Sequence, residues 1–97
     1  MARLSKTAAA ILSSAPPLPL EDAHWKEVVN AIGLSKRQAE VAELMLRDLC
    51  DKQIAVVLGI GRSTIDTHTE RIERRTGTRG RMQLAMHVLA VSHQVAR

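Results

Sequence analysis

Aromatic residues are almost absent from this chain of 97 residues: Trp25 is the only one, and there is no Tyr or Phe. Binding of single-stranded nucleic acid relies on aromatic side chains on which the bases stack, so this scarcity argues against that function. Hydrophobic residues still make up 45% of the sequence. We therefore expect one domain with an aliphatic core of Leu, Ile, Val, Met and Ala, which suits packed helices.

Cysteine and long apolar runs are scarce as well. The single Cys50 excludes an intrachain disulfide and suits a reducing cytosol, so a cytoplasmic location is expected. No apolar run approaches the roughly 20 residues of a membrane span. The histidines lack the spacing of metal ligands, and neither a nucleophile–base arrangement nor a glycine-rich phosphate loop is present. The sequence thus predicts no enzyme activity, no cofactor, no metal and no small-molecule ligand.

An excess of negative charge is also missing, and the net charge is +4. Residues 1–61 carry seven basic and seven acidic side chains, whereas residues 62–81 carry six arginines and three acids. Such local positive charge is typical of a phosphate-binding surface, but also of a solvated helix face with salt bridges. Charge alone leaves both interpretations open.

Proline, glycine and capping residues divide the first half of the chain into a tail and two predicted helices. Residues 1–19 are expected to be a flexible tail, with at most a weak alanine-rich helix, that ends in a proline-rich linker. Residues 20–33 predict a separate amphipathic helix that turns its Trp25 face to the domain and stops at Gly33. Ser35 and Gln38 have the spacing of a capping box, which predicts a helix through about residue 47.

Three further helices are predicted, at 52–58 after Asp51 as N-cap, at 62–76, and at 81–95. Between the first two, Gly59 can adopt the positive φ that reverses the chain within a few residues. One shared interior is expected for Ile54, Leu58, Ile60, Ile65 and Ile72. Because alternation with a period of two is absent, the predicted class is all-α. The pattern favours a DNA-binding helix-turn-helix over an ordinary helical hairpin.

The other face of the 62–76 helix is hydrophilic. Its side chains can bond to phosphates or base edges, and they are Ser63, Asp66, Thr67, Glu70, Arg71 and Arg74. This face is the expected contact with double-stranded DNA.

Four segments resemble successive motifs of the LuxR-type helix-turn-helix domain, which is found at the C-termini of many bacterial response regulators and quorum-sensing receptors. They are LSKRQAEV (34–41), DKQIAVVLGI (51–60), RSTIDTH (62–68) and RTGTRGRMQLA (75–85). The resemblance implies an all-α, four-helix domain over 34–97, to which 20–33 adds an N-terminal amphipathic helix. It also implies a role in transcription regulation, with the third core helix in the major groove and the fourth often mediating dimerisation.

The resemblance assigns roles to single residues. Lys52 lies where the family commonly contacts phosphate, and Thr64 where a threonine helps to fix the start of the recognition helix and touches the DNA backbone. Arg71 and Arg75 flank the groove. The full set expected to bind DNA is Lys52, Arg62, Ser63, Thr64, Asp66, Thr67, Glu70, Arg71, Arg74 and Arg75.

Base-reading positions of the family fall on Asp66, Thr67 and Glu70, and a pair that is often a structural salt bridge falls on Glu40 and Arg81. The two carboxylates depart from the family, which frequently has lysine or another non-acidic residue there. A carboxylate can accept a hydrogen bond from cytosine N4, yet it repels phosphate. The departure supports an alternative function, a protein-interaction module on the same fold with weak or no DNA binding.

Two further features bear on stability and assembly. Asp48 stands where the family commonly has a glycine at the end of a helix, which is expected to cost a little cap stability. The 81–95 helix is apolar on two sides. One stripe is Leu84, Val88, Val91 and Val95, and the other is Met82, Met86, Leu89 and His93. A helix apolar on two sides is usually buried on two sides. The second stripe is expected to form a homodimer interface, or else to be covered by the helix of Trp25.

Overall fold

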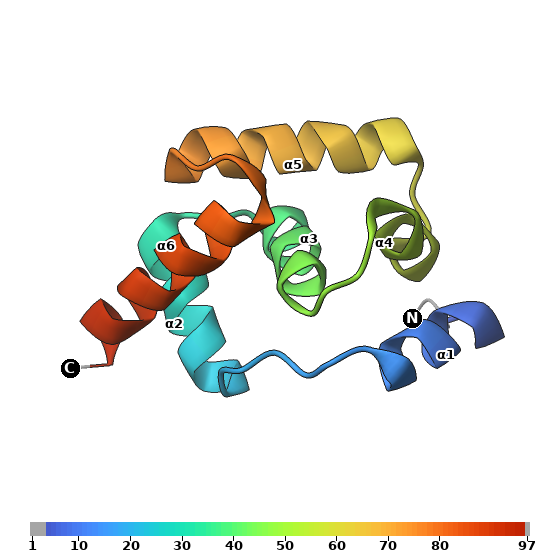
Figure 1. The fold of residues 1–97 in the computed structure, drawn as a ribbon, viewed down its shortest axis with the longest axis horizontal. Coiled ribbons are helices and arrows are strands. Elements are labelled where there is room, and N and C mark those ends of the chain that lie inside the picture. The colour runs from blue at the N-terminus through green and yellow to red at the C-terminus, as the bar shows by residue number, and fades with distance from the viewer. Residues whose placement is uncertain (1–3, 97) are drawn as a thin grey trace.

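The computed structural model of this protein describes residues 4–96, and every regular element in that range is an α-helix (Figure 1). The helices are α1 (Lys6–Ser14), α2 (Asp22–Ile32), α3 (Lys36–Leu46), α4 (Asp51–Leu58), α5 (Arg62–Thr76) and α6 (Gly80–Val95). The predicted all-α class is confirmed. The predicted bounds of α5 agree with the structure, whereas α6 begins one residue earlier than predicted.

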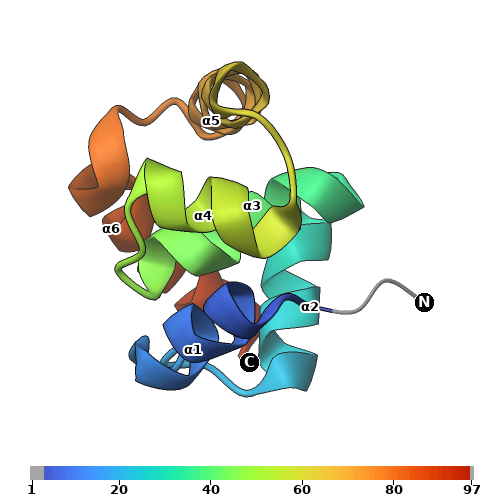
Figure 2. The same ribbon diagram turned by 90° about the vertical axis from the view of Figure 1, so that its right-hand side faces the viewer.

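Helices α3 to α6 pack around one aliphatic core, and α2 lies against α6. Ile54, Ile65 and Ile72 are fully buried, as predicted, while Leu58 and Ile60 are partly buried against the same core. Helix α5 lies across the outer side of α3 and α4 (Figures 1 and 2). One side of α5 is therefore part of the core, and its other side faces solvent.

The turn between α4 and α5 depends on Gly59, which has a φ of 67°. The Ile60 amide donates a hydrogen bond to the Ala55 carbonyl at 3.1 Å, which closes the end of α4. Side chains strongly disfavour this left-handed conformation, and glycine adopts it freely. The chain can therefore leave α4 and begin α5 after only two more residues.

The end of α3 has the same geometry without a glycine. Asp48 has a φ of 65°, and it is the one non-glycine residue with a positive φ among residues 4–96. Its amide donates to the Met45 carbonyl at 3.0 Å, and the Leu49 amide donates to the Leu44 carbonyl at 3.1 Å. These two bonds make up a complete Schellman motif. The predicted cap cost at Asp48 thus has a physical basis in a backbone conformation that side chains disfavour.

The N-terminal segment differs from the flexible tail expected over 1–19, of which residues 1–3 lie outside the described range. Lys6–Ser14 is a helix capped by Ser5, whose Oγ accepts from the Ala8 amide at 3.0 Å. Ala8 is only 1% exposed, and α1 packs on the side of α4 away from α5 (Figure 2). A small alanine face carries little sequence signal for packing, which explains why the contact was not predicted.

Arg47 fastens α1 and the proline-rich linker to the end of α3. Its Nε donates to the Pro16 carbonyl at 2.8 Å, and its Nη2 donates to the Leu12 carbonyl at 3.0 Å. The second bond satisfies a carbonyl of the last turn of α1, which has no partner within the helix. The segment is thus held by a charged side chain from another helix as well as by apolar contact.

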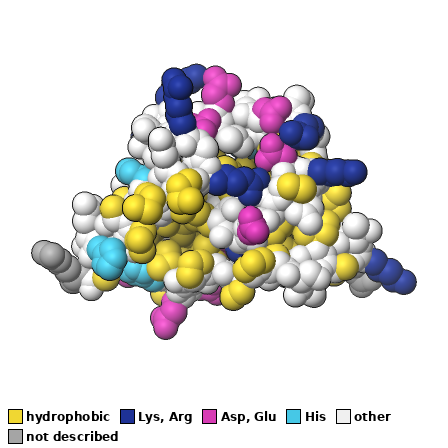
Figure 3. Space-filling model, in the orientation of Figure 1, with side chains coloured by type: hydrophobic (Ala, Val, Ile, Leu, Met, Phe, Trp, Pro, Cys, Tyr) yellow, Lys and Arg dark blue, Asp and Glu magenta, His cyan; other side chains and the backbone are white. Residues whose placement is uncertain are grey.

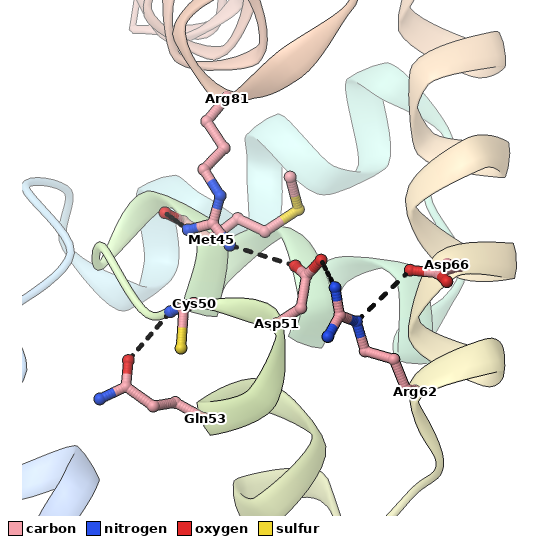
Figure 4. Close-up of polar contacts among 7 residues, drawn as sticks. All are labelled: Met45, Cys50, Asp51, Gln53, Arg62, Asp66 and Arg81. Atoms are coloured by element: carbon pink, nitrogen blue, oxygen red, sulfur yellow. Dashed lines mark hydrogen bonds and ion pairs between the residues drawn. The ribbon is translucent and has the colours of Figure 1, made fainter.

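The start of α4 also differs from prediction. Cys50 is the N-cap and Asp51 is the first helical residue, so the prediction of Asp51 as N-cap is wrong by one position. The Cys50 amide donates to Gln53 Oε1 at 2.9 Å (Figure 4). The Asp51 carboxylate is consequently available for contacts with other helices.

Candidate nucleic-acid interface

The outer face of α5 is a continuous hydrophilic surface. Ile65 and Ile72 anchor the opposite face in the core. The predicted DNA-binding side chains are all exposed, namely Lys52 near the start of α4 and Arg62, Ser63, Thr64, Asp66, Thr67, Glu70, Arg71, Arg74 and Arg75 on α5. Figure 3 shows charged side chains of both signs gathered over α5 along the upper edge of the molecule. Burial of two isoleucines therefore fixes which side chains α5 offers to a partner.

Ion pairs divide the arginines of this face into two groups. Arg62 lies 3.4 Å from Asp51 and 3.8 Å from Asp66, and Arg74 lies 3.0 Å from Glu70. For Arg71 and Arg75, no ion pair is found within the described part of the chain. These exposed pairs contribute little to stability, about 0–1 kcal/mol each, so DNA phosphates can exchange with the carboxylates at low cost.

Asp51 joins helices α4, α5 and α6 beside the start of α5 (Figure 4). Its Oδ2 faces Arg62, and its Oδ1 accepts from Arg81 Nη2 at 3.3 Å. Arg81 Nη1 also donates to the Met45 carbonyl at 3.3 Å, at the end of α3. Arg81 thereby connects the start of α6 with α3 and α4, and Asp51 pairs with the guanidinium group of Arg62.

The predicted salt bridge between Glu40 and Arg81 is wrong. Glu40 instead pairs with Arg37 on its own helix at 3.4 Å, while Arg81 pairs with Asp51. The family motif correctly marked Arg81 as structural, but its partner comes from the start of α4. Asp51 was missed as a network residue because it was interpreted as a cap. An acidic residue in the first turn of a helix, close to a predicted arginine-rich face, was the available signal.

The C-terminal end of α5 carries a second cationic region. Gln38, Arg71, Arg74 and Arg75 line an open depression between the start of α3 and the end of α5. The guanidinium group of Arg75 packs over Gly33. A Cβ atom at that position would lie 3.6 Å from the guanidinium carbon, which is van der Waals contact distance. Several guanidinium groups around one shallow site suit a phosphate. Gln38 was predicted only as a capping residue, and the structure brings it beside the arginines.

Two polar side chains of α5 act within the fold. Thr67 Oγ1 donates to the Ser63 carbonyl at 3.0 Å, which orients the threonine and leaves its oxygen able to accept. Glu73 Oε2 accepts from the Gly80 amide at 2.7 Å and ties the start of α6 to α5. Glu73 therefore belongs to the scaffold, although it lies in the charged stretch of the sequence.

Helix α6 has one covered and one open apolar stripe. Leu84 and Val88 are buried, and α2 packs against α6. Met82, Met86 and Leu89 are 77%, 61% and 51% exposed, and His93 is exposed as well. Figure 3 shows a hydrophobic patch on the α6 side of the molecule. The alternative that the helix of Trp25 covers the second stripe is therefore wrong.

Within residues 4–96, no group of three or more His, Cys, Asp and Glu side chains is placed to hold a metal ion. None of the described helices combines the length and the apolar character needed to cross a membrane.

A short helix, a glycine turn and a longer helix with an exposed, polar and arginine-rich face together define a helix-turn-helix protein of the DNA-binding class. The model of the family described as bacterial regulatory proteins, luxR family, matches residues 33–88. The chain is also similar to the spore germination protein GerE of Bacillus subtilis (strain 168). The two are 36% identical over 64 residues, which are 66% of this chain and 86% of that protein.

The chain therefore belongs to the LuxR family, and it contains a LuxR-type helix-turn-helix DNA-binding domain of transcription regulation. A search of solved structures found no significant match. The resemblance deduced from the sequence motifs is confirmed by the family match.

Proposed function

We propose that the protein binds double-stranded DNA sequence-specifically, with α5 in the major groove, to regulate bacterial transcription. The observation that carries the proposal is the outer face of α5, on which every predicted contact residue from Arg62 to Arg75 is exposed. A single α-helix with a hydrophilic outer face fits the major groove. Since bacterial chromosomal DNA lies in the cytoplasm, the proposal implies a cytoplasmic protein.

Phosphate binding is assigned to cations at both ends of α5. Lys52 and Arg62 lie near its start, and Arg71, Arg74 and Arg75 near its end. At 1.5 Å per residue, the 15-residue helix is about 22 Å long, so these groups can engage the backbones on either side of a groove about 12 Å wide. Thr64, in the first turn, adds a backbone contact there.

Base recognition is assigned to Ser63, Asp66, Thr67 and Glu70, which lie between these ends, and also to Arg71, whose guanidinium has donors for both a phosphate and a base edge. They carry hydroxyl, carboxylate and guanidinium groups, which form hydrogen bonds with base edges. Each good base contact is expected to contribute about 1–3 kcal/mol of discrimination.

The test is titration of duplex DNA at several salt concentrations with Arg71→Ala/Arg74→Ala. Loss of two phosphate contacts should weaken binding and reduce the slope of log affinity against log salt by up to about 1.8. The matched control is Lys6→Ala/Lys26→Ala, which removes two exposed cations from α1 and α2, away from the outer face of α5. Wild-type affinity and salt slope in the arginine variant would refute the assignment of this face.

Homodimerisation through α6 is proposed as well. Met82, Met86, Leu89 and His93 share one exposed stripe, and large apolar side chains gathered on one exposed face mark an interaction site. Sedimentation equilibrium should show a dimer for the wild type and a monomer for Met86→Glu/Leu89→Glu. Val56→Glu, at an exposed apolar residue of α4, is the control and should remain dimeric.

The alternative function is a protein-interaction module on the same fold. Asp66 and Glu70 support it, because both carboxylates are exposed on the face offered to DNA. Random-sequence duplex DNA at low salt separates the two functions. A stable folded dimer that does not bind such DNA would favour the alternative, and salt-dependent binding would favour the proposed function.

A further inference from the structure

Four charged residues recur at every fourth position of α5, in the order Arg62, Asp66, Glu70 and Arg74. Side chains four residues apart are neighbours on a helix surface, so these four form one ridge. The ridge is positive at each end and negative in the middle. All four side chains are between 64% and 75% exposed. None of them is needed to fill the core.

The ends and the middle of this ridge would meet different parts of a DNA duplex. From the helical rise, Arg62 and Arg74 are about 18 Å apart along the axis, and Asp66 and Glu70 are about 6 Å apart. The major groove is about 12 Å wide. When α5 occupies the groove, the middle of its outward ridge faces the base edges, and its two ends approach the phosphates.

Each carboxylate of the ridge is paired with the arginine beside it. Glu70 Oε1 lies 3.0 Å from Arg74 Nη2, and Asp66 Oδ1 lies 3.8 Å from Arg62 Nε. Pairing reduces the repulsion between the carboxylates and nearby phosphates. An ionised carboxylate has about four lone-pair sites, so Glu70 can accept a further hydrogen bond. The guanidinium groups likewise retain donors for phosphate.

Cytosine is the base whose major-groove edge best suits a side chain that only accepts. It presents the N4 amino donor and no acceptor. Guanine presents two acceptors, and thymine presents one acceptor and a methyl group. Adenine presents its amino donor next to the acceptor N7. A carboxylate at the floor of the groove is therefore repelled by guanine and thymine, partly repelled by adenine, and attracted by cytosine.

We infer that Asp66 and Glu70 determine specificity by selecting cytosine at two positions of the DNA segment that α5 contacts, while Arg62 and Arg74 bind the flanking phosphates. The inference rests on the proposed entry of α5 into the major groove.

Selection of bound sequences from a random duplex pool tests this inference. The wild type should enrich cytosine at two positions. Glu70→Gln should change one of them from cytosine to adenine, because a glutamine amide bonds bidentately to adenine N6 and N7. Asp66→Asn should make the same change at the other. Replacing one selected C·G pair by T·A should weaken wild-type binding about 5- to 150-fold.

The matched control is Glu27→Gln, which removes a 58% exposed carboxylate from α2 and should select the wild-type motif. Since Asp66 and Glu70 are exposed, their variants should fold, and circular dichroism checks this. The inference would be overturned if the wild type selected no cytosine, or if Asp66→Asn and Glu70→Gln both selected the wild-type motif. Either result would leave the proposed binding in the major groove unaffected. Failure of the wild type to bind any duplex at low salt would overturn the proposed function together with it.

Discussion

Replacing Asp48 with glycine should stabilise the protein, although the substitution removes a side chain and adds no contact. Asp48 has a φ of 65° at the end of α3, and its side chain is exposed, so no packing is lost. Both hydrogen bonds of the Schellman motif come from backbone amides and are retained. The change therefore acts on backbone strain and on one charge.

The magnitude follows from three contributions. A side chain in the left-handed region costs roughly 1–2 kcal/mol, with aspartate at the lower end. A negative charge near a helix C-terminus costs about 0.3–1 kcal/mol. Glycine loses more conformational entropy on folding than aspartate does, which destabilises the variant by about 0.5–1 kcal/mol. We expect a net stabilisation of about 0.5–1.5 kcal/mol and a rise in Tm of about 3–10 °C.

Thermal and urea unfolding of Asp48→Gly, Asp48→Asn and Asp48→Ala measures these contributions separately. Asparagine tolerates the conformation and removes the charge, so it should stabilise slightly. Alanine keeps the Cβ and tolerates this conformation less well than aspartate, so it should not match glycine. A glycine variant no more stable than the wild type would refute the reasoning from backbone strain.

Two further predictions concern Arg47 and Glu43. Arg47→Ala removes the hydrogen bonds to the Leu12 and Pro16 carbonyls. The free energy of opening α1 should therefore fall by about 1–3 kcal/mol, which hydrogen exchange measures. The amides of α5 should stay protected. Burial, with nearby acidic side chains, raises the pKa of Glu43 above its ordinary value, and Arg47 opposes the shift. A raised carboxyl pKa destabilises the folded state as pH rises through the shifted value, so Glu43→Gln should raise Tm at pH 7 and lose this advantage below the ordinary pKa. An equal gain at all pH values would contradict that explanation.

Several local features were predictable because their causes lie within a few residues. The capping box of Ser35 and Gln38 is present, with reciprocal bonds of 3.0 and 3.2 Å. The turn at Gly59 and the buried isoleucines of α5 also follow from residue type and spacing. Since the opposite face of α5 is hydrophilic, it stays exposed when the isoleucine face is buried. The location of the candidate interface was therefore available before any contact between helices was known.

Contacts across helices were not predictable in the same way. Arg81 and Asp51 are 30 positions apart, and Arg47 reaches carbonyls 31 and 35 positions away. Such pairs depend on which helix ends meet in space, and the sequence offers several partners of suitable charge. The family motif therefore indicated a structural arginine at 81 and assigned it the wrong carboxylate.

By itself, the sequence determined helices α2 to α6, their approximate ends and the side chains that share a face, because capping and periodicity act over one or two turns. Only the tertiary structure decided that α1 packs on α4, and which apolar stripe of α6 is covered. Both stripes of α6 have suitable spacing, so periodicity cannot rank them. Packing of α2 against α6, with Leu84 and Val88 buried, leaves Met82, Met86 and Leu89 exposed. That choice depends on how whole helices fit together, which no short stretch of sequence contains.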